Sequence, residues 1–129
     1  MPGTRDRGEV SAQVAVIAPL LFSLVFAVVH AGSLWIAAQT AQVAARRGAR
    51  AASTAPDGTA YYEDAARAVE MTVRELGGQL AAPPRIAMGA ASVTVDVSLG
   101  FARVVPFLPD RVARSVTVPL ERYVPESER

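Results

Sequence analysis

A long stretch without charged side chains is the dominant pattern of the sequence. No Asp, Glu, Lys or Arg occurs from Val10 to Ala45. Its apolar core, Val14 to Ile36, exceeds the length of about 20 apolar residues that cross the hydrocarbon layer of a membrane as a helix. Good helix formers continue to Ala52, and only Gly48 weakens the pattern. The sequence therefore predicts one helix from about Ser11 to Ser53 that crosses a membrane and projects beyond it.

Two local features modify this predicted helix. Pro19 lacks an amide hydrogen, so we expect a kink or a local loosening between Ala15 and Pro19. Further along, small residues recur every four positions on one stripe, a spacing that allows a second helix to approach closely. Because alanine is abundant throughout the chain, compositional bias explains the stripe equally well. The stripe comprises Ala37, Ala41, Ala45 and Ala49, with Ala44, Gly48 and Ala52 beside it.

The remainder of the chain predicts a small domain with a second helix at its start. Pro56-Asp57-Gly58 forms a turn signal, because each of these residue types favours turns for its own physical reason. A helical pattern runs from Thr59 to the pair Gly77-Gly78, which ends it. We expect its apolar face to comprise Tyr62, Ala66, Val69, Val73 and Leu76.

After Pro83-Pro84 the pattern changes to the strict alternation of a half-buried strand. The odd-numbered residues from Val93 to Phe101 are apolar and predicted to face inward. A second alternating strand covers 115–120, where Pro119 indicates an edge or an end. The pattern also allows a short strand at Arg85 to Met88. The predicted fold class is therefore α+β, with a long transmembrane helix, a second helix and a small antiparallel sheet.

Composition removes several classes of function. The chain contains no cysteine, which excludes disulfides, iron–sulfur clusters and thiolate zinc sites. Its single histidine, His30, lies within the apolar run, where we expect a neutral, packed ring. The formal net charge of +1 argues against a nucleic-acid-binding protein. We predict no enzymatic activity, no catalytic residue, no cofactor and no metal.

Residues at the outer end of the apolar run predict a contact with the membrane surface. Trp35 is typical of the interface between hydrocarbon and headgroups. Arg46, Arg47 and Arg50 form a basic cluster that can meet lipid phosphates while the side-chain stems stay apolar. A solvated helix face or a contact with a partner protein are the alternative roles for these arginines.

The residues before the apolar run resemble a prepilin-type signal, in which cleavage precedes the helix and the helix is retained. Arg7-Gly8 is followed by Glu9, and a polar residue, Gln13, occupies the fifth position after the glycine. An ordinary secretory signal has its cleavage site after the apolar segment. We therefore predict processing between Gly8 and Glu9.

Three stretches of the chain resemble the TadE-like family of pilin-like proteins of the tight-adherence (Flp) pilus system. The first is Asp6-Arg7-Gly8 leading into 13–21, with Pro19-Leu20-Leu21 inside the membrane helix. The second is the alanine-rich segment 41–52, which contains Gly48-Ala49-Arg50-Ala51. The third combines the alternating strand 93–99 with the closing segment 116–122.

This resemblance implies a TadE-like minor pilin or pseudopilin, a non-catalytic subunit of Tad/Flp pilus assembly. Its implied organisation is a leader at 1–8, a transmembrane and assembly helix at 9–53, and an extracytoplasmic domain at 54–129. The implied partners are other pilin-like subunits, pilus platform proteins, the prepilin-type peptidase and membrane lipids, with no nucleic acid. The protein is expected to be a single-pass, pilus-associated protein of the cytoplasmic membrane, with its N-terminus inside.

One residue departs from the family pattern. The fifth position after the glycine is usually glutamate, whose carboxylate pairs with the free amine of a neighbouring subunit, and here it is Gln13. Glutamine accepts a hydrogen bond but supplies no charge. The resemblance assigns Gln13 and Pro19 to assembly, and the departure leaves the charge-driven part of filament assembly in doubt.

Two alternatives remain open. An ordinary signal peptide cut after Ala31 would release a secreted domain, and its small or short residues at Val29 and Ala31 suit such a cut. An uncleaved single-pass subunit of another envelope complex would keep the topology and retain Met1 to Gly8.

Overall fold

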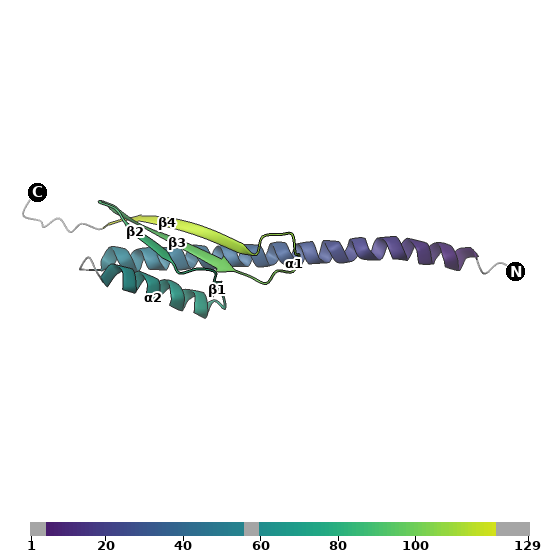
Figure 1. Cartoon of the computed structure of the whole chain (residues 1–129), viewed down its shortest axis with the longest axis horizontal. Helices are drawn as coiled ribbons and strands as arrows, with labels where there is room; N and C mark the ends of the chain where they lie inside the picture. The colour runs from purple at the N-terminus through teal and green to yellow at the C-terminus, as the bar shows by residue number, and fades with distance from the viewer. Residues whose placement is uncertain (1–4, 56–59, 121–129) are drawn as a thin grey trace, which may run out of the picture.

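The computed structural model describes residues 5–55 and 60–120 of the chain. Helix α1 (Arg5–Thr54) is followed by α2 (Ala60–Glu75) and the strands β1 (Gln79–Leu80), β2 (Arg85–Met88), β3 (Ser92–Gly100) and β4 (Arg111–Pro119). Figure 1 shows α2 and the strands lying against the C-terminal half of α1, while the N-terminal half projects alone. The predicted α+β class, with a long helix, a second helix and a small antiparallel sheet, is confirmed.

Helix α1 is longer than the sequence pattern predicts. It begins at Arg5 and so includes residues of the predicted leader. It also runs without interruption through Pro19, so the loosening expected there does not break the helix. The turn predicted at Pro56-Asp57-Gly58 lies outside the described residues.

The sheet is built around β3. Strand β4 pairs antiparallel with β3 along its whole length, from Ser92 opposite Pro119 to Gly100 opposite Arg111. On the other side of β3, β1 pairs with its C-terminal end and β2 with its N-terminal end. β4 is thus an edge strand, and Pro119 stands at its last position, where no further ladder bond is needed. The predicted strands are confirmed, and β1 is an addition of only two residues.

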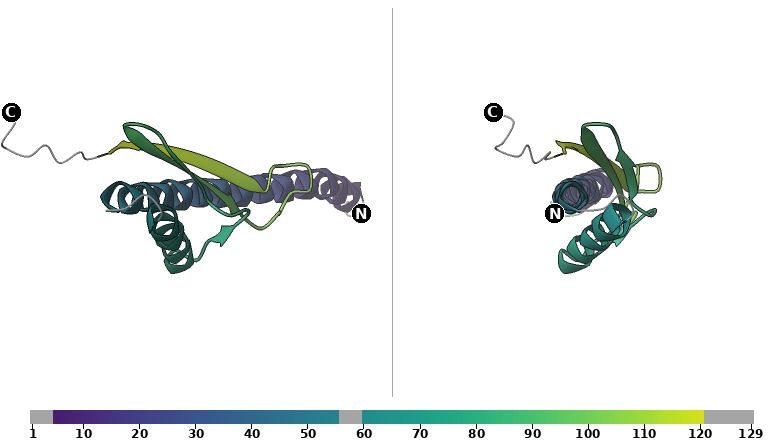
Figure 2. Two further views of the ribbon diagram at one scale, coloured as in Figure 1. Left: turned by 60° about the vertical axis from the view of Figure 1, so that its left-hand side comes forward. Right: turned by 90° about the vertical axis from the view of Figure 1, so that its left-hand side faces the viewer.

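The core lies between the sheet and the two helices. The inward residues of β3 are 0–1% exposed, which confirms the alternation read from the sequence: Val93, Val95, Val97 and Leu99. The small-residue stripe of α1 is buried in the same cluster, with Ala41, Ala44, Ala45 and Ala49 at 0% exposure. Figure 2 shows α2 and the sheet on neighbouring sides of α1. The stripe therefore packs against the chain's own domain, and close packing, rather than compositional bias alone, accounts for it.

The buried face of α2 differs from the predicted one. Val69 and Val73 are buried as expected, but Tyr62 and Leu76 are 47% and 50% exposed. Ala65 and Thr72 take the buried positions instead. The close approach of α1 at Gly48 places Ala65 and Val69 in the contact between the helices. Tyr61 therefore packs against the core in place of Tyr62.

Helix α2 ends at the predicted glycine pair. Gly77 adopts a positive φ of 69°, a conformation that costs glycine little. Its amide donates to the Arg74 carbonyl (3.1 Å), and the amide of Gly78 donates to the Val73 carbonyl (2.8 Å). These two bonds form a Schellman motif, which satisfies carbonyls at the helix end.

Gly48 lies in a close contact between α1 and α2. A Cβ atom at this position would lie 2.6 Å from Cγ2 of Val69 and 3.3 Å from the carbonyl oxygen of Ala65. Valine is stiff at χ1 and cannot swing away easily. The glycine that weakens the helix in the sequence pattern is therefore required by the helix packing.

We expect Gly48→Ala to destabilise the domain although alanine is the better helix former. Overpacking costs about 1–3 kcal/mol, which outweighs a gain of about 1 kcal/mol in helix propensity. The expected result is a thermal unfolding midpoint lower by about 5 °C in detergent solution. Gly32→Ala is the matched control, because a Cβ at Gly32 meets no atom within 4 Å. Equal midpoints for both variants would contradict the packing role of Gly48.

Candidate functional site

The N-terminal half of α1 exposes an apolar surface that nothing in the described chain covers. By length and composition, the segment Ser11–Thr54 contains a span able to cross a membrane, and 6% of its most apolar window is buried. The exposed large side chains of this half are Val14, Val16, Ile17, Leu20, Leu21, Phe22, Leu24, Val25, Phe26, Val28 and Val29. A surface of this kind is unfavourable in water and suits lipid or the helices of other subunits.

Hydroxyl groups on this apolar half are satisfied within the helix. The Ser23 hydroxyl donates to the Pro19 carbonyl (2.8 Å), and the Ser33 hydroxyl donates to the Val29 carbonyl (3.0 Å). Such bonds to the carbonyl four residues earlier remove free donors that would be costly in hydrocarbon. The helix can thus carry two serines without an unsatisfied hydroxyl donor.

His30 marks the point where the apolar half of α1 meets the domain. Its side chain is 3% exposed, and Nε2 donates a hydrogen bond to the carbonyl of Pro109 (3.0 Å) in the loop between β3 and β4. The ring also meets Phe101 edge-on, with centroids 5.4 Å apart. Because a carbonyl only accepts, Nε2 carries the proton and Nδ1 is left as a buried acceptor without a partner. The packed His30 predicted from sequence is confirmed, and its partners come from a distant loop.

We expect His30→Phe to loosen this loop while keeping the aromatic contact with Phe101. The lost hydrogen bond contributes about 1 kcal/mol, which corresponds to roughly fivefold more frequent opening. The amide of Phe101, which donates to the Asp110 carbonyl, reports on that opening. Its hydrogen exchange should become about fivefold faster, and an unchanged rate would contradict the role of His30.

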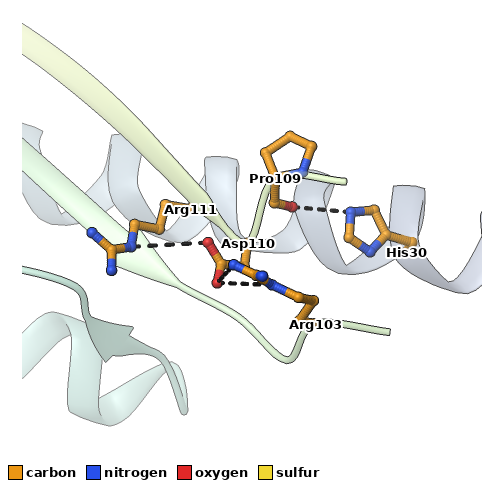
Figure 3. A network of polar contacts seen from close by, with 5 residues as sticks. All are labelled: His30, Arg103, Pro109, Asp110 and Arg111. Atoms are coloured by element: carbon orange, nitrogen blue, oxygen red, sulfur yellow. Dashed lines mark hydrogen bonds and ion pairs between the residues drawn. The ribbon is translucent and has the colours of Figure 1, made fainter. Parts of the chain in front are cut away.

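An ion pair joins the two ends of the same loop. Arg103 donates from Nη2 and Nε to Oδ2 of Asp110, at 2.6 and 3.2 Å (Figure 3), and Arg111 Nε lies 3.9 Å from Oδ1. The hydrogen bond from Arg103 lowers the pKa of the Asp110 carboxyl below its ordinary value of 3.8. A lowered pKa in the folded state means that this pair is fully formed above pH 3.8 and is lost only as the pH falls through the lowered value.

The four residues predicted to contact the membrane surface differ in their surroundings. Trp35 is exposed beside the start of the domain. Arg47 is paired with Glu75 of α2 (3.1 Å) and lies 3.4 Å from the Thr72 hydroxyl. Arg46 and Arg50 line, with Arg47, an open groove of about 530 Å³ between α1 and strand β4. The structure thus gives Arg47 a partner within the chain.

The predicted processing and assembly residues all lie in α1. Gly8 and Glu9 belong to the first turns of the helix, and Gln13 is exposed close behind them. Pro19 is also in the exposed half. All four lie in the projecting half of one helix, and their roles in processing and assembly stay predictions.

The long helix α1 has two parts with different surroundings. One helix has an exposed apolar half able to cross a membrane, and its other half forms the core of a small α+β domain. The model of the family described as TadE-like protein matches residues 8–50, entirely within α1. The match confirms the similarity to this family over the helix, where the first two of the three resembling stretches lie. No curated protein and no solved structure matches the chain.

Proposed function

We propose that this protein is a non-catalytic, pilin-like subunit of Tad/Flp pilus assembly, anchored in the cytoplasmic membrane by the N-terminal half of α1. Its N-terminus faces the cytoplasm, and its α+β domain lies outside. The observation that carries the proposal is the division of α1 within the family-matched segment. One half is committed to the domain core, and the other presents an uncovered apolar surface.

The uncovered part of the uncharged run supports a defined position in the bilayer. The whole run, Val10 to Ala45, is longer than the hydrocarbon layer is thick, but its part before the buried His30, Val10 to Val29, extends about 30 Å as a helix, which matches that thickness. Trp35 follows about 9 Å further along the axis, and helical side chains lean back toward the N-terminus. The indole is thereby brought to the headgroup layer, where tryptophan is enriched.

Distances along the axis of α1 revise the role expected for the arginine cluster. Arg46 lies about 25 Å beyond Val29 along the helix axis, whereas the headgroup layer is only about 5–8 Å deep. We therefore assign Arg47 to the ion pair with Glu75. Arg46 and Arg50 are assigned to the groove beside β4, where an acidic group of a partner subunit could bind.

The apolar half of α1 is the proposed contact with other pilin-like subunits and with platform proteins. Residues 1–8 form the leader in this proposal, and a prepilin-type peptidase cleaves between Gly8 and Glu9. Gln13 would then contribute hydrogen bonds rather than charge to a neighbouring subunit. The Glu9 carboxylate, adjacent to the new amine, offsets its charge.

The secreted-domain alternative conflicts with the packing of His30. A cut after Ala31 would remove this buried ring from the domain and leave Phe101 and Pro109 without their partner on α1. The uncleaved-subunit alternative shares the topology and differs in two respects: residues 1–8 are retained, and the subunit belongs to another envelope complex.

Cross-linking in native membranes tests the proposed contacts. The chain has no native cysteine, so Leu20→Cys introduces a single thiol on the apolar half of α1. We expect adducts with other pilin-like subunits or platform proteins, and their loss in cells that lack the remaining pilus components. Leu76→Cys, on the exposed side of α2, is the matched control and should give no such adducts. Adducts that persist unchanged in those cells would contradict a role in the pilus.

A further inference from the structure

The loop between β3 and β4 presents an apolar turn at the edge of the domain. The amide of Leu108 donates to the Val105 carbonyl (3.2 Å), closing a turn with Pro106 at its second position, where proline is favoured. No charged residue occurs from Val104 to Pro109. Phe107, at the third position of the turn, is 86% exposed, more than any large apolar side chain reported for the exposed half of α1.

The turn is held in a fixed place beside α1. The bond from His30 to Pro109 ties its C-terminal side to the helix, and the packing of His30 on Phe101 ties the start of the loop. The Arg103–Asp110 ion pair joins the two ends of the loop. Figure 1 shows the loop alongside α1 where the projecting half of the helix begins. These three contacts hold the loop in place. The fold therefore keeps the Phe107 side chain exposed.

The level of this loop coincides with the proposed membrane boundary. The part of the uncharged run that precedes the domain, Val10 to Val29, matches the hydrocarbon thickness, and the next residue, the buried His30, holds the loop. Apolar Phe107 and Leu108 thus lie at the hydrocarbon edge. The charged pair Arg103–Asp110 at the ends of the loop suits the headgroup layer.

We propose that this loop is a second membrane contact, with the turn Val105–Leu108 inserting Phe107 into the outer edge of the hydrocarbon layer beside α1. The inference rests on the proposed membrane position of α1. Lipid is favoured over a partner protein because the apolar turn is held beside α1 at the level of His30, next to the exposed apolar surface of the helix. The contact restricts the tilt of the domain, so that α2 and the sheet keep a defined orientation above the bilayer.

Tryptophan fluorescence in vesicles tests this contact. The full chain with Trp35→Phe and Phe107→Trp is reconstituted in phosphatidylcholine vesicles whose acyl chains carry bromine at shallow or deep positions. We expect blue-shifted emission from residue 107 and quenching at least twofold stronger by shallow than by deep bromine. Met88→Trp in the same background is the matched control. Met88 pairs with Val93 at the end of β3 remote from the loop, and a tryptophan there should stay unquenched.

A third variant separates failure of the loop contact from failure of the anchor. Val25→Trp in the Trp35→Phe background reports whether α1 itself spans the bilayer. Quenching at residue 25 with water-like, unquenched emission at residue 107 would overturn the loop contact and leave the anchor standing. Absence of quenching at both positions would overturn the anchor and the loop contact together. A blue shift at residue 107 that requires pilus platform proteins and shows no bromine quenching would instead identify a protein contact and overturn the lipid contact.

Discussion

Leu20→Arg is expected to prevent stable membrane anchoring of the chain. Leu20 is exposed near the middle of Val10–Val29, the part of the uncharged run that precedes the domain. Replacing leucine by arginine at the centre of a membrane helix costs about 3 kcal/mol, which lowers the inserted fraction roughly a hundredfold. Carbonate extraction of membranes should therefore move most of the variant into the soluble or degraded fraction.

Leu76→Arg is the control for this substitution. Leu76 is a leucine of comparable exposure at the end of α2, in the domain that we place outside the membrane. This variant should stay in the membrane fraction like the unmodified protein. Full retention of Leu20→Arg in extracted membranes would mean that the apolar half of α1 does not cross the bilayer.

Ala45→Leu is expected to unfold the domain or weaken it severely. Ala45 has no exposed surface and lies in the cluster shared by α1, α2 and β3. Added methylenes in a closely packed core cost about 1–3 kcal/mol or more, a large part of the stability of so small a domain. We expect the thermal unfolding midpoint in detergent to fall by about 10 °C or more.

Ala31→Leu distinguishes this packing role from a role in contacts between subunits. Ala31 is an exposed alanine of the same helix, so leucine there should leave the midpoint unchanged. If the stripe served contacts between subunits instead, Ala45→Leu would keep the midpoint of the isolated protein and reduce only pilus assembly. That outcome would contradict the internal role of the stripe.

The elements with strong local patterns could be predicted from the sequence. The uncharged run identified α1, and strict alternation identified β3 with the correct residues inward, because each pattern reflects burial of the element itself. The glycine pair correctly located the end of α2, since Gly77 adopts a conformation that favours glycine. These features depend on residues close together in the chain.

Features that depend on two distant segments could not be predicted. The alanine stripe indicates close packing but does not say whether the partner is another subunit or the same chain. The helical pattern of α2 predicts Val69 and Val73 as buried correctly, but it also places Tyr62 inward, whereas the close approach of α1 at Gly48 buries Ala65. The pairing of His30 with Pro109 joins residues 79 positions apart, and a single histidine in an apolar helix was its only signal.

One continuous helix, α1, carries the apolar half and also forms part of the domain core. Because residues 37–52 of α1 form part of the domain core, a force or rotation applied to the apolar half is transmitted to the domain without an intervening linker. The small-residue packing at Gly48 and the His30 contact contribute to this coupling. Such rigid coupling suits a subunit whose assembly depends on the position of its neighbours in the membrane.

The N-terminus of the protein purified from native membranes tests the central claim most directly. Intact mass and N-terminal sequencing should give a chain that begins at Glu9 and retains all of α1 that follows. That result would establish prepilin-type processing with the membrane helix kept in the mature subunit. A chain that begins at Gly32 would contradict the account, because the apolar half and His30 would then have been removed from the folded domain.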